Sequence, residues 1–212
     1  MGYGEPKRPS IREFFRFFAP NLPSIFVIFL MAFMTIANSW LADAEQIPSP
    51  NQDDRPDPDD ISLIVIHGIS LPPGEFGGPW ITRLFTNTLP ADVHPYFELI
   101  HQFKVSAHVL IRRDGHIVQY VPFDRRAWHA GVSAYQGRER CNDFSVGIEL
   151  EGTDDLPYED AQYASLNRII DVLVEHYPLL SRNCIAGHSE IAPGRKTDPG
   201  QAFEWGRIRA TV

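Results

Sequence analysis

The sequence is poor in cysteine, in basic residues and in long apolar runs, and each shortage excludes or disfavours certain classes of protein. Its 2 cysteines, Cys141 and Cys184, are too few for a disulfide framework or a four-sulfur zinc site, although a single disulfide stays open. The 19 basic residues against 27 acidic ones give a net charge of −8, and no basic patch offsets it, so we expect no nucleic-acid partner. The chain also lacks an HExxH motif, which excludes metalloproteases of that type.

Residues 1–38 differ in character from the rest of the chain. Four basic residues precede the apolar run 25–34, and residues 42–44 read Ala-Asp-Ala, a profile typical of a cleaved signal peptide. The run is shorter than the roughly 20 apolar residues that span a bilayer, so we expect no stable membrane insertion. Alternatively, Met34 is the true start and the upstream stretch is a mis-assigned extension. The second alternative predicts a cytoplasmic protein, whereas a genuine signal over residues 1–44 predicts a periplasmic one.

Residues 39–60 form a lead-in rich in proline and aspartate. The stretch 47–60 alone holds four prolines and five aspartates, a composition that predicts an extended surface segment and disfavours a helix or a central strand. The 43% of hydrophobic residues and 22% of charged residues are typical of a folded chain, and 212 residues favour one catalytic domain. We therefore predict that this single domain spans residues 61–212.

From residue 61 onward the hydrophobic pattern predicts strands alternating with helices. The predicted strands cover residues 61–66, 105–111, 116–121 and 145–151, and an amphipathic helix lies between residues 159 and 177. The first strand ends at His67 and delivers that imidazole at its carboxyl end. In the last strand Glu149 and Glu151 share the face opposite the apolar side chains. This order predicts an α/β or α+β fold with a sheet packed against helices.

Three residues of the sequence form a candidate metal site. His67 follows a strand end, His188 lies in a glycine- and proline-rich loop, and Asp198 follows ten residues later. Two neutral imidazoles and one carboxylate suit Zn²⁺, and catalytic zinc sites use three protein ligands and keep one position for water or substrate. Spacing alone leaves the alternative that His67 is a hydrogen-bonded core residue and Asp198 a turn residue.

A serine hydrolase is the weaker alternative. Ser106 and His108 share one face of a predicted strand, as a nucleophile and its base would. The chain offers neither a nucleophile elbow nor an obvious acidic partner for this pair. The sequence therefore disfavours a serine nucleophile.

Several long blocks of the chain carry a resemblance to a known family. They include HGISLPPGEFGG at 67–78, AWHAG at 127–131, YQGRERCND at 135–143, GIELEGTD at 147–154 and KTDPG at 196–200. These blocks closely resemble the cytoplasmic N-acetylmuramoyl-L-alanine amidases, and the similarity runs from about Trp40 to the C-terminus, while residues 1–38 have no counterpart. The resemblance implies a mixed central β-sheet flanked by helices, as in peptidoglycan recognition proteins. It also implies hydrolysis of the amide between the lactyl group of anhydro-N-acetylmuramic acid and L-alanine of the stem peptide, during peptidoglycan recycling.

The resemblance also assigns roles to individual residues. One Zn²⁺ per chain is expected on His67, His188 and Asp198. Glu149 corresponds to the catalytic carboxylate that handles the protons, and Lys196 to the lysine that stabilises the oxyanion. The expected substrate-binding residues are Trp128, Arg140 and Lys104. His108 and His129 are candidates for groups that support the ligands.

Two positions depart from the family pattern, and they concern substrate contacts. Gly68 replaces an asparagine and loses an amide near the metal, and Lys104 replaces an arginine and cannot make a planar bidentate contact. Neither change removes a zinc ligand or Glu149. Two alternatives to a recycling amidase are kept: a non-catalytic module that binds peptidoglycan fragments, and an exported amidase acting on periplasmic peptidoglycan. A monomer is the default.

Overall fold

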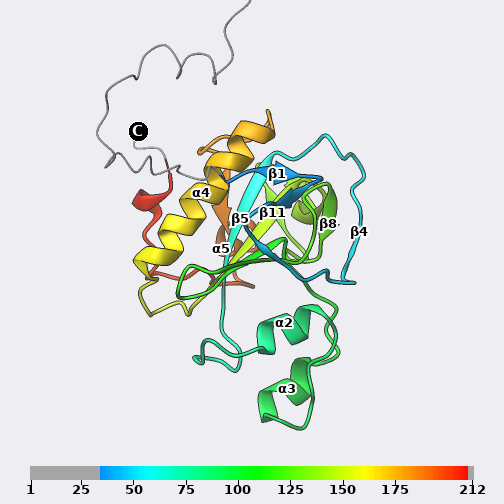
Figure 1. Cartoon of the computed structure of the whole chain (residues 1–212), viewed down its shortest axis with the longest axis vertical. Coiled ribbons are helices and arrows are strands. Elements are labelled where there is room, and N and C mark those ends of the chain that lie inside the picture. Colours follow the sequence, from blue (N-terminus) through cyan, green and yellow to red (C-terminus); the bar gives the residue numbers. More distant parts are fainter. Residues whose placement is uncertain (1–33, 210–212) are drawn as a thin grey trace, which may run out of the picture. The chain divides into compact units, whose positions relative to one another are not determined.

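A six-stranded sheet lies at the centre of the computed structural model, which describes residues 34–209 (Figure 1). Its strands, in spatial order, are β12 (Ile185–Gly187), β5 (Leu63–Ile69), β11 (Ser145–Glu151), β6 (Val109–Ile111), β7 (Ile117–Gln119) and β3 (Glu45–Gln46). β12, β5, β11 and β6 run parallel to their neighbours, β6 pairs antiparallel with β7, and β3 pairs parallel with β7. The predicted mixed sheet is therefore confirmed.

Short elements surround this sheet. Three two-stranded ribbons pair β1 (Ile36–Ala37) with β2 (Trp40–Leu41), β4 (Gln52–Asp54) with β8 (Arg125–Ala127), and β9 (Ala134–Tyr135) with β10 (Arg138–Glu139). The helices are α2 (Trp80–Phe85), α3 (Pro95–Ile100), α4 (Asp160–His176) and α5 (His188–Ile191), with 3₁₀ turns at Cys141–Asp143 and Trp205–Arg207. Within the described range, no helix has the length and apolar character needed to cross a membrane.

The two central strands are buried on both faces, which is why their sequences are so apolar. One face packs against α4, which crosses the sheet in Figure 1 and buries Leu166, Ile170 and Leu173 against it. The other face carries His67 from β5 and Glu149 from β11, which are direct partners in the parallel register. The fold thus places two of the predicted site residues side by side.

The sequence located β11 and α4 well, but it placed His67 incorrectly. Seven residues of β5 pair with seven of β11, as far as Ile69 opposite Glu151. The strand therefore continues past Gly68, and His67 lies within it. Pairing with a long parallel neighbour extends β5 beyond the point at which a glycine suggests a strand end.

The lead-in runs extended, as predicted, but it is not only a surface segment. Its β4 forms an edge ribbon with β8, while Arg55 is only 6% exposed. The Arg55 guanidinium donates hydrogen bonds to the backbone carbonyls of Phe123, Asn142, Asp143 and Ser145. Burial lowers its pKa to about 10. This one side chain therefore binds the lead-in to the turn that precedes β11.

Replacing Arg55 with methionine is expected to lower the free energy of unfolding by about 2–4 kcal/mol, because buried carbonyls lose their donors. Urea unfolding followed by circular dichroism measures the change. Arg168→Met is the control, because the Arg168–Asp43 ion pair is half-exposed and such pairs contribute at most about 1 kcal/mol. Equal unfolding midpoints for the two variants would show that Arg55 contributes no more than a surface arginine.

Both cysteines are free thiols in the structure. Cys141 is buried beneath the turn before β11, and Cys184 is partly buried near the start of β12. Burial raises the pKa of the Cys141 thiol, which keeps it protonated and unreactive. The disulfide that the composition left open is therefore not formed.

Candidate metal centre and active site

Three neighbouring elements bring the predicted ligands together. β5 carries His67, and the adjacent parallel strand β12 leads directly into α5, whose first residue is His188. Asp198 lies in the loop after α5, which returns to the sheet because the Ser189 N–H donates to the Asp198 carbonyl at 2.9 Å. Residues 121 and 131 positions away from His67 in the chain therefore meet beside it.

The three side chains converge on one point. The Nδ1 atoms of His67 and His188 are 2.9 Å apart, and each lies 3.1 Å from Oδ2 of Asp198. Both imidazoles are buried, whereas the Asp198 side chain is 16% exposed. The geometry forms a small triangle of ligand atoms with one partly open side.

The charges of these groups suit a cation. Burial is the main reason that the pKa of His67 falls to about 4, so this imidazole is neutral at physiological pH. Burial alone would raise the pKa of Asp198, but its contacts with His188 and His67 outweigh that effect and hold the pKa below its ordinary value. His188 Nε2 faces the carbonyl of Ala130 at 3.1 Å, and a carbonyl can only accept. In neutral His188 the Nδ1 atom therefore carries a lone pair directed at Asp198.

This donor set fits a divalent metal ion. One ion at about 2 Å from each ligand, the usual zinc distance, can contact all three atoms of the triangle. Two imidazole nitrogens and one carboxylate oxygen are a ligand set typical of zinc, and three protein ligands leave one position for water or substrate. The three residues that the sequence predicted as ligands thus lie close enough together for their ligand atoms to hold one metal ion.

Glu149 stands next to this triangle in an unusual environment. It is 9% exposed, and among the described residues its Oε2 atom has no hydrogen-bond partner. Burial raises the pKa of Glu149 well above its ordinary value, the charge of Asp198 raises it further, and the Lys196 ammonium opposes both. A buried carboxylate with a raised pKa and a free oxygen is suited to take up and release a proton.

Its neighbour Glu151 has a different environment on the same face. Glu151 Oε1 accepts a hydrogen bond from the Gly77 N–H at 2.6 Å, and Oε2 accepts one from the Arg113 N–H at 3.2 Å. Both oxygens therefore hold backbone segments in place. The structure distinguishes the two glutamates that share one face by what their oxygens contact.

The remaining predicted residues are more scattered. Lys196 is exposed, and its positive charge acts on both His67 and Glu149. Trp128 donates its Nε1–H to Oδ1 of Asp53 at 3.0 Å, which ties it to the β4 ribbon. Lys104 is exposed and outside the cavity described next. The structure thus places Lys196 near the triangle, while Trp128 has a packing contact that the sequence did not reveal.

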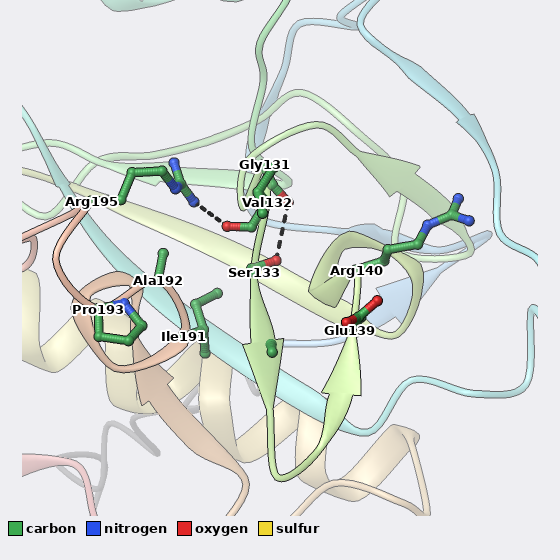
Figure 2. A pocket seen from close by; sticks show the side chains of 10 residues that line it. Gly131, Val132, Ser133, Glu139, Arg140, Ile191, Ala192, Pro193 and Arg195 are labelled. Atoms are coloured by element: carbon green, nitrogen blue, oxygen red, sulfur yellow. Dashed lines mark hydrogen bonds between the residues drawn. The ribbon is translucent and has the colours of Figure 1, made fainter.

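A cavity of about 530 Å³ lies beside α5 (Figure 2), and its lining includes none of the three ligand residues and not Glu149. Its lining includes Ile191, Ala192 and Pro193 from α5 and the following loop, and Arg140 and Arg195, which stand on opposite sides in Figure 2. Arg140 is the one predicted substrate-binding residue in this lining. The walls combine apolar side chains with two guanidinium groups and the carboxylate of Glu139.

Sequence reasoning overlooked Arg195. Its Nη2 donates hydrogen bonds to the carbonyls of Ala130 at 2.6 Å and Val132 at 2.7 Å, and Figure 2 shows the guanidinium directed at this backbone. Because the partners are carbonyls, no residue pattern indicates them. The contact connects the loop of Asp198 with the segment that holds His188.

His108 and Ser106 take part in backbone hydrogen bonding. His108 Nδ1 accepts from the Gly147 N–H at 3.0 Å, so its Nε2–H donates to the carbonyl of Arg125. Ser106 Oγ donates to the carbonyl of Asn51 and accepts from the Trp128 N–H. Each is already engaged away from the other, which gives no support to the serine-hydrolase alternative.

At Gly68, where the sequence departs from the family pattern, the structure leaves no room for a side chain. A Cβ atom at this position would lie 2.3 Å from the Tyr158 hydroxyl, which donates to the carbonyl of Pro199 at 2.9 Å. Tyr158 therefore occupies the space that any side chain at residue 68 would enter. By donating to the carbonyl of Pro199, Tyr158 holds the residue that follows Asp198, and the absence of a side chain at Gly68 leaves room for this contact.

A buried triangle of two histidines and an aspartate beside an unpartnered glutamate is typical of metal-dependent hydrolases. Comparison with known proteins specifies the class. The family model of N-acetylmuramoyl-L-alanine amidases matches residues 57–201. The 1,6-anhydro-N-acetylmuramyl-L-alanine amidase AmpD of Citrobacter freundii is 62% identical over 179 residues, which are 84% of this chain and 95% of that protein.

Solved structures agree with this match. A crystal structure of a selenomethionine derivative of AmpD is 62% identical, with a TM-score of 0.80 over 82% of this chain and 97% of that one. The amidase AmiD of E. coli, in complex with its substrate anhydro-N-acetylmuramic acid-L-Ala-D-γ-Glu-L-Lys, is 26% identical, with a TM-score of 0.51 over 83% of this chain and 64% of that one. The chain therefore belongs to the N-acetylmuramoyl-L-alanine amidase family and is an amidase, which confirms the predicted fold and enzyme class.

Proposed function

We propose that this protein is a zinc amidase that cleaves anhydro-muropeptides between the lactyl carbonyl of anhydro-N-acetylmuramic acid and the nitrogen of L-alanine. The observation that carries this proposal is the triangle of His67, His188 and Asp198 ligand atoms beside the unpartnered Glu149 carboxylate. The name of the C. freundii relative and the ligand bound to AmiD support the anhydro sugar and the stem peptide as the substrate class.

His67, His188 and Asp198 would hold one zinc ion. When bound, zinc polarises a carbonyl and lowers the pKa of water toward about 7, which supplies a nucleophile at neutral pH. The protein contributes the placement of the ligands: β5 and β12 are parallel neighbours, and the Asp198 loop is pinned to α5. Burial lowers the pKa of His67, which keeps this imidazole neutral and available as a ligand.

Glu149 would handle the protons of the reaction. It accepts a proton from the attacking water as the oxygen forms its bond to the lactyl carbonyl carbon, and it then delivers a proton to the L-alanine nitrogen as the carbon–nitrogen bond breaks. The products are the free lactyl carboxylic acid of the anhydro sugar and the intact peptide with a new amino terminus. The raised pKa of Glu149 supports both steps, because burial makes the carboxylate a stronger base than an ordinary glutamate and lets the protonated form persist to higher pH.

Lys196 would stabilise the negative oxygen that develops on the carbonyl. Its positive charge acts on both Glu149 and His67, which supports this role. Arg140 would bind a carboxylate of the stem peptide at the edge of the α5 cavity, with Trp128 and Lys104 as further substrate contacts. The Lys104 ammonium cannot make the planar bidentate contact that an arginine guanidinium makes, so we expect weaker discrimination between substrates at this position.

The test is mass spectrometry of the products formed from anhydro-N-acetylmuramoyl-tripeptide. The expected result is release of the intact tripeptide and the free anhydro sugar, abolished by a metal chelator and restored by zinc. If the folded, zinc-replete protein binds the fragment without cleaving it, the binding-module alternative is correct and the amidase proposal fails. Cleavage at any other amide would contradict the proposed substrate assignment.

The proposed site of action is the cytoplasm, on recycled fragments, with one zinc ion in a monomeric chain. The alternative is an exported enzyme that acts on periplasmic peptidoglycan. The segment that decides between them, residues 1–33, lies outside the described residues. Sequencing of the mature amino terminus separates the two: a start near Met34 supports the cytoplasm, and a start after Ala44 supports export.

A further inference from the structure

The ring nitrogen of His67 that faces away from the metal triangle, Nε2, contacts another histidine. His67 Nε2 lies 2.9 Å from His129 Nδ1, and His129 Nε2 lies 3.2 Å from the Ser145 hydroxyl. The Ser145 hydroxyl in turn donates to the carbonyl of Cys141 at 2.6 Å. These contacts form an unbroken path from the metal triangle to the protein backbone.

The end of this path determines where every proton sits. A carbonyl can only accept, so the single Ser145 proton points at Cys141 and the hydroxyl must accept from His129 Nε2–H. In neutral His129 the Nδ1 atom then has a lone pair, and it accepts the proton on His67 Nε2. His67 Nδ1 is left with a lone pair that faces Asp198 and His188. One carbonyl thus selects the tautomer of His67 that can bind a metal.

Two further contacts hold His129 in position for this role. The His129 ring lies directly over Gly147, where a Cβ atom would be 2.4 Å from the ring, so only glycine allows this approach. Asn142 Oδ1 accepts the backbone N–H groups of His129 at 3.2 Å and Ala130 at 2.8 Å. Asn142 therefore positions both groups that receive the outer protons of the two histidine ligands.

We propose that His129 and Ser145 are positioning residues that fix the proton of His67 on Nε2 and so present its Nδ1 lone pair to the metal. The inference rests on the proposed zinc site and adds to it the residues that prepare His67 for binding. Such partners of metal-ligating histidines typically change metal affinity by about 10–100-fold. Neither residue touches the substrate in this assignment.

The first test compares two substitutions of equal size at His129 in the full-length protein. His129→Asn retains an acceptor oxygen at the position of Nδ1, whereas His129→Leu has the same shape without an acceptor. Zinc affinity is measured by competition with a chromophoric chelator. We expect His129→Leu to weaken zinc binding about 10–100-fold, and His129→Asn to restore most of that loss. Equal affinities for the two variants would show that only packing matters, which would overturn the proposal.

The second test removes the selector of the tautomer. Ser145→Ala leaves His129 Nε2–H without its acceptor, and we expect about tenfold weaker zinc binding at the lower end of that range. Ser165→Ala is the matched control, since Ser165 is also a buried serine that donates to a carbonyl, that of Gly115 at 2.7 Å, on the remote helix α4. Parent affinity in Ser145→Ala, or an equal loss in the control, would overturn the proposal even if His129→Leu fails to fold.

Nitrogen NMR of the zinc-loaded protein, labelled on histidine, supplies an independent signature. The expected spectrum shows His67 with its proton on Nε2 and a coupling across the hydrogen bond to His129 Nδ1. A proton on Nδ1 of His67 would overturn the proposal. Failure of the zinc site itself has a different outcome, because the parent protein would then bind no zinc, and both proposals would fall together.

Discussion

Replacing Glu149 with glutamine is expected to lower kcat by about 10²–10⁴-fold, the range that proton transfer by a positioned side chain contributes, while zinc binding stays at the parent level. The amide has nearly the same shape as the carboxyl group but can neither accept nor deliver the proton. Because Glu149 is a strand partner of His67 and contacts none of the ligand atoms through its free oxygen, the metal triangle is expected to persist.

Steady-state hydrolysis of anhydro-N-acetylmuramoyl-tripeptide and zinc content by atomic absorption measure the two properties. The control is Glu175→Gln on α4, an exposed carboxylate on the helix that packs against the opposite face of the sheet, which is expected to retain kcat within a few-fold. A kcat within tenfold of the parent in Glu149→Gln would remove Glu149 from the chemistry.

The stability of the same variant checks that the fold is intact. The pKa of Glu149 is higher in the folded protein than in the unfolded chain. The stability that this group contributes is therefore fully present below its unfolded pKa and is lost as pH rises through its folded pKa. A neutral amide removes this penalty. At pH 7 the metal-free Glu149→Gln protein should therefore unfold at a urea concentration equal to or higher than the parent.

Strong local periodicity explains which parts of the fold could be predicted. Alternation over β11 and the three- and four-residue spacing of apolar residues over α4 specify these elements without tertiary information. β12 and α5 are only three and four residues long, too short for a periodic signal. They form because β5 offers an open edge for pairing, which is a property of the assembled sheet.

The metal ligands were predictable for a related reason. His67, His188 and Asp198 are chemically distinctive side chains, and the family resemblance named them before their convergence was visible. The groups that support them carry no such signal: a carbonyl of Ala130, one of Cys141, and the hydroxyl of Ser145. Arg55 was hidden in the same way, because its partners are backbone carbonyls and its neighbours in sequence are typical of a surface segment.

Replacing His188 with alanine is expected to abolish both zinc binding and hydrolysis, in contrast to Glu149→Gln. The substitution removes one corner of the triangle, and loss of a direct ligand should cost more than the about 100-fold that loss of a supporting group costs. It also leaves the carboxylate of Asp198 without one of the two imidazoles that hold its pKa below the ordinary value. Two of the three ligands are then too few to retain zinc against a chelator.

The measurement is zinc content and product release after dialysis, with His116→Ala as the control, because His116 is half-exposed and pairs with Glu45 far from the site. If His188→Ala retained stoichiometric zinc, the metal would have to bind elsewhere, and the triangle would lose its proposed role. Considered with Glu149→Gln, the two variants separate the functions of the site. One should keep the metal without the proton transfer, and the other should lose the metal while its buried Glu149 carboxylate stays in place. If the enzyme needs both the metal and Glu149, both variants are inactive, and zinc content shows which of the two groups each variant has lost.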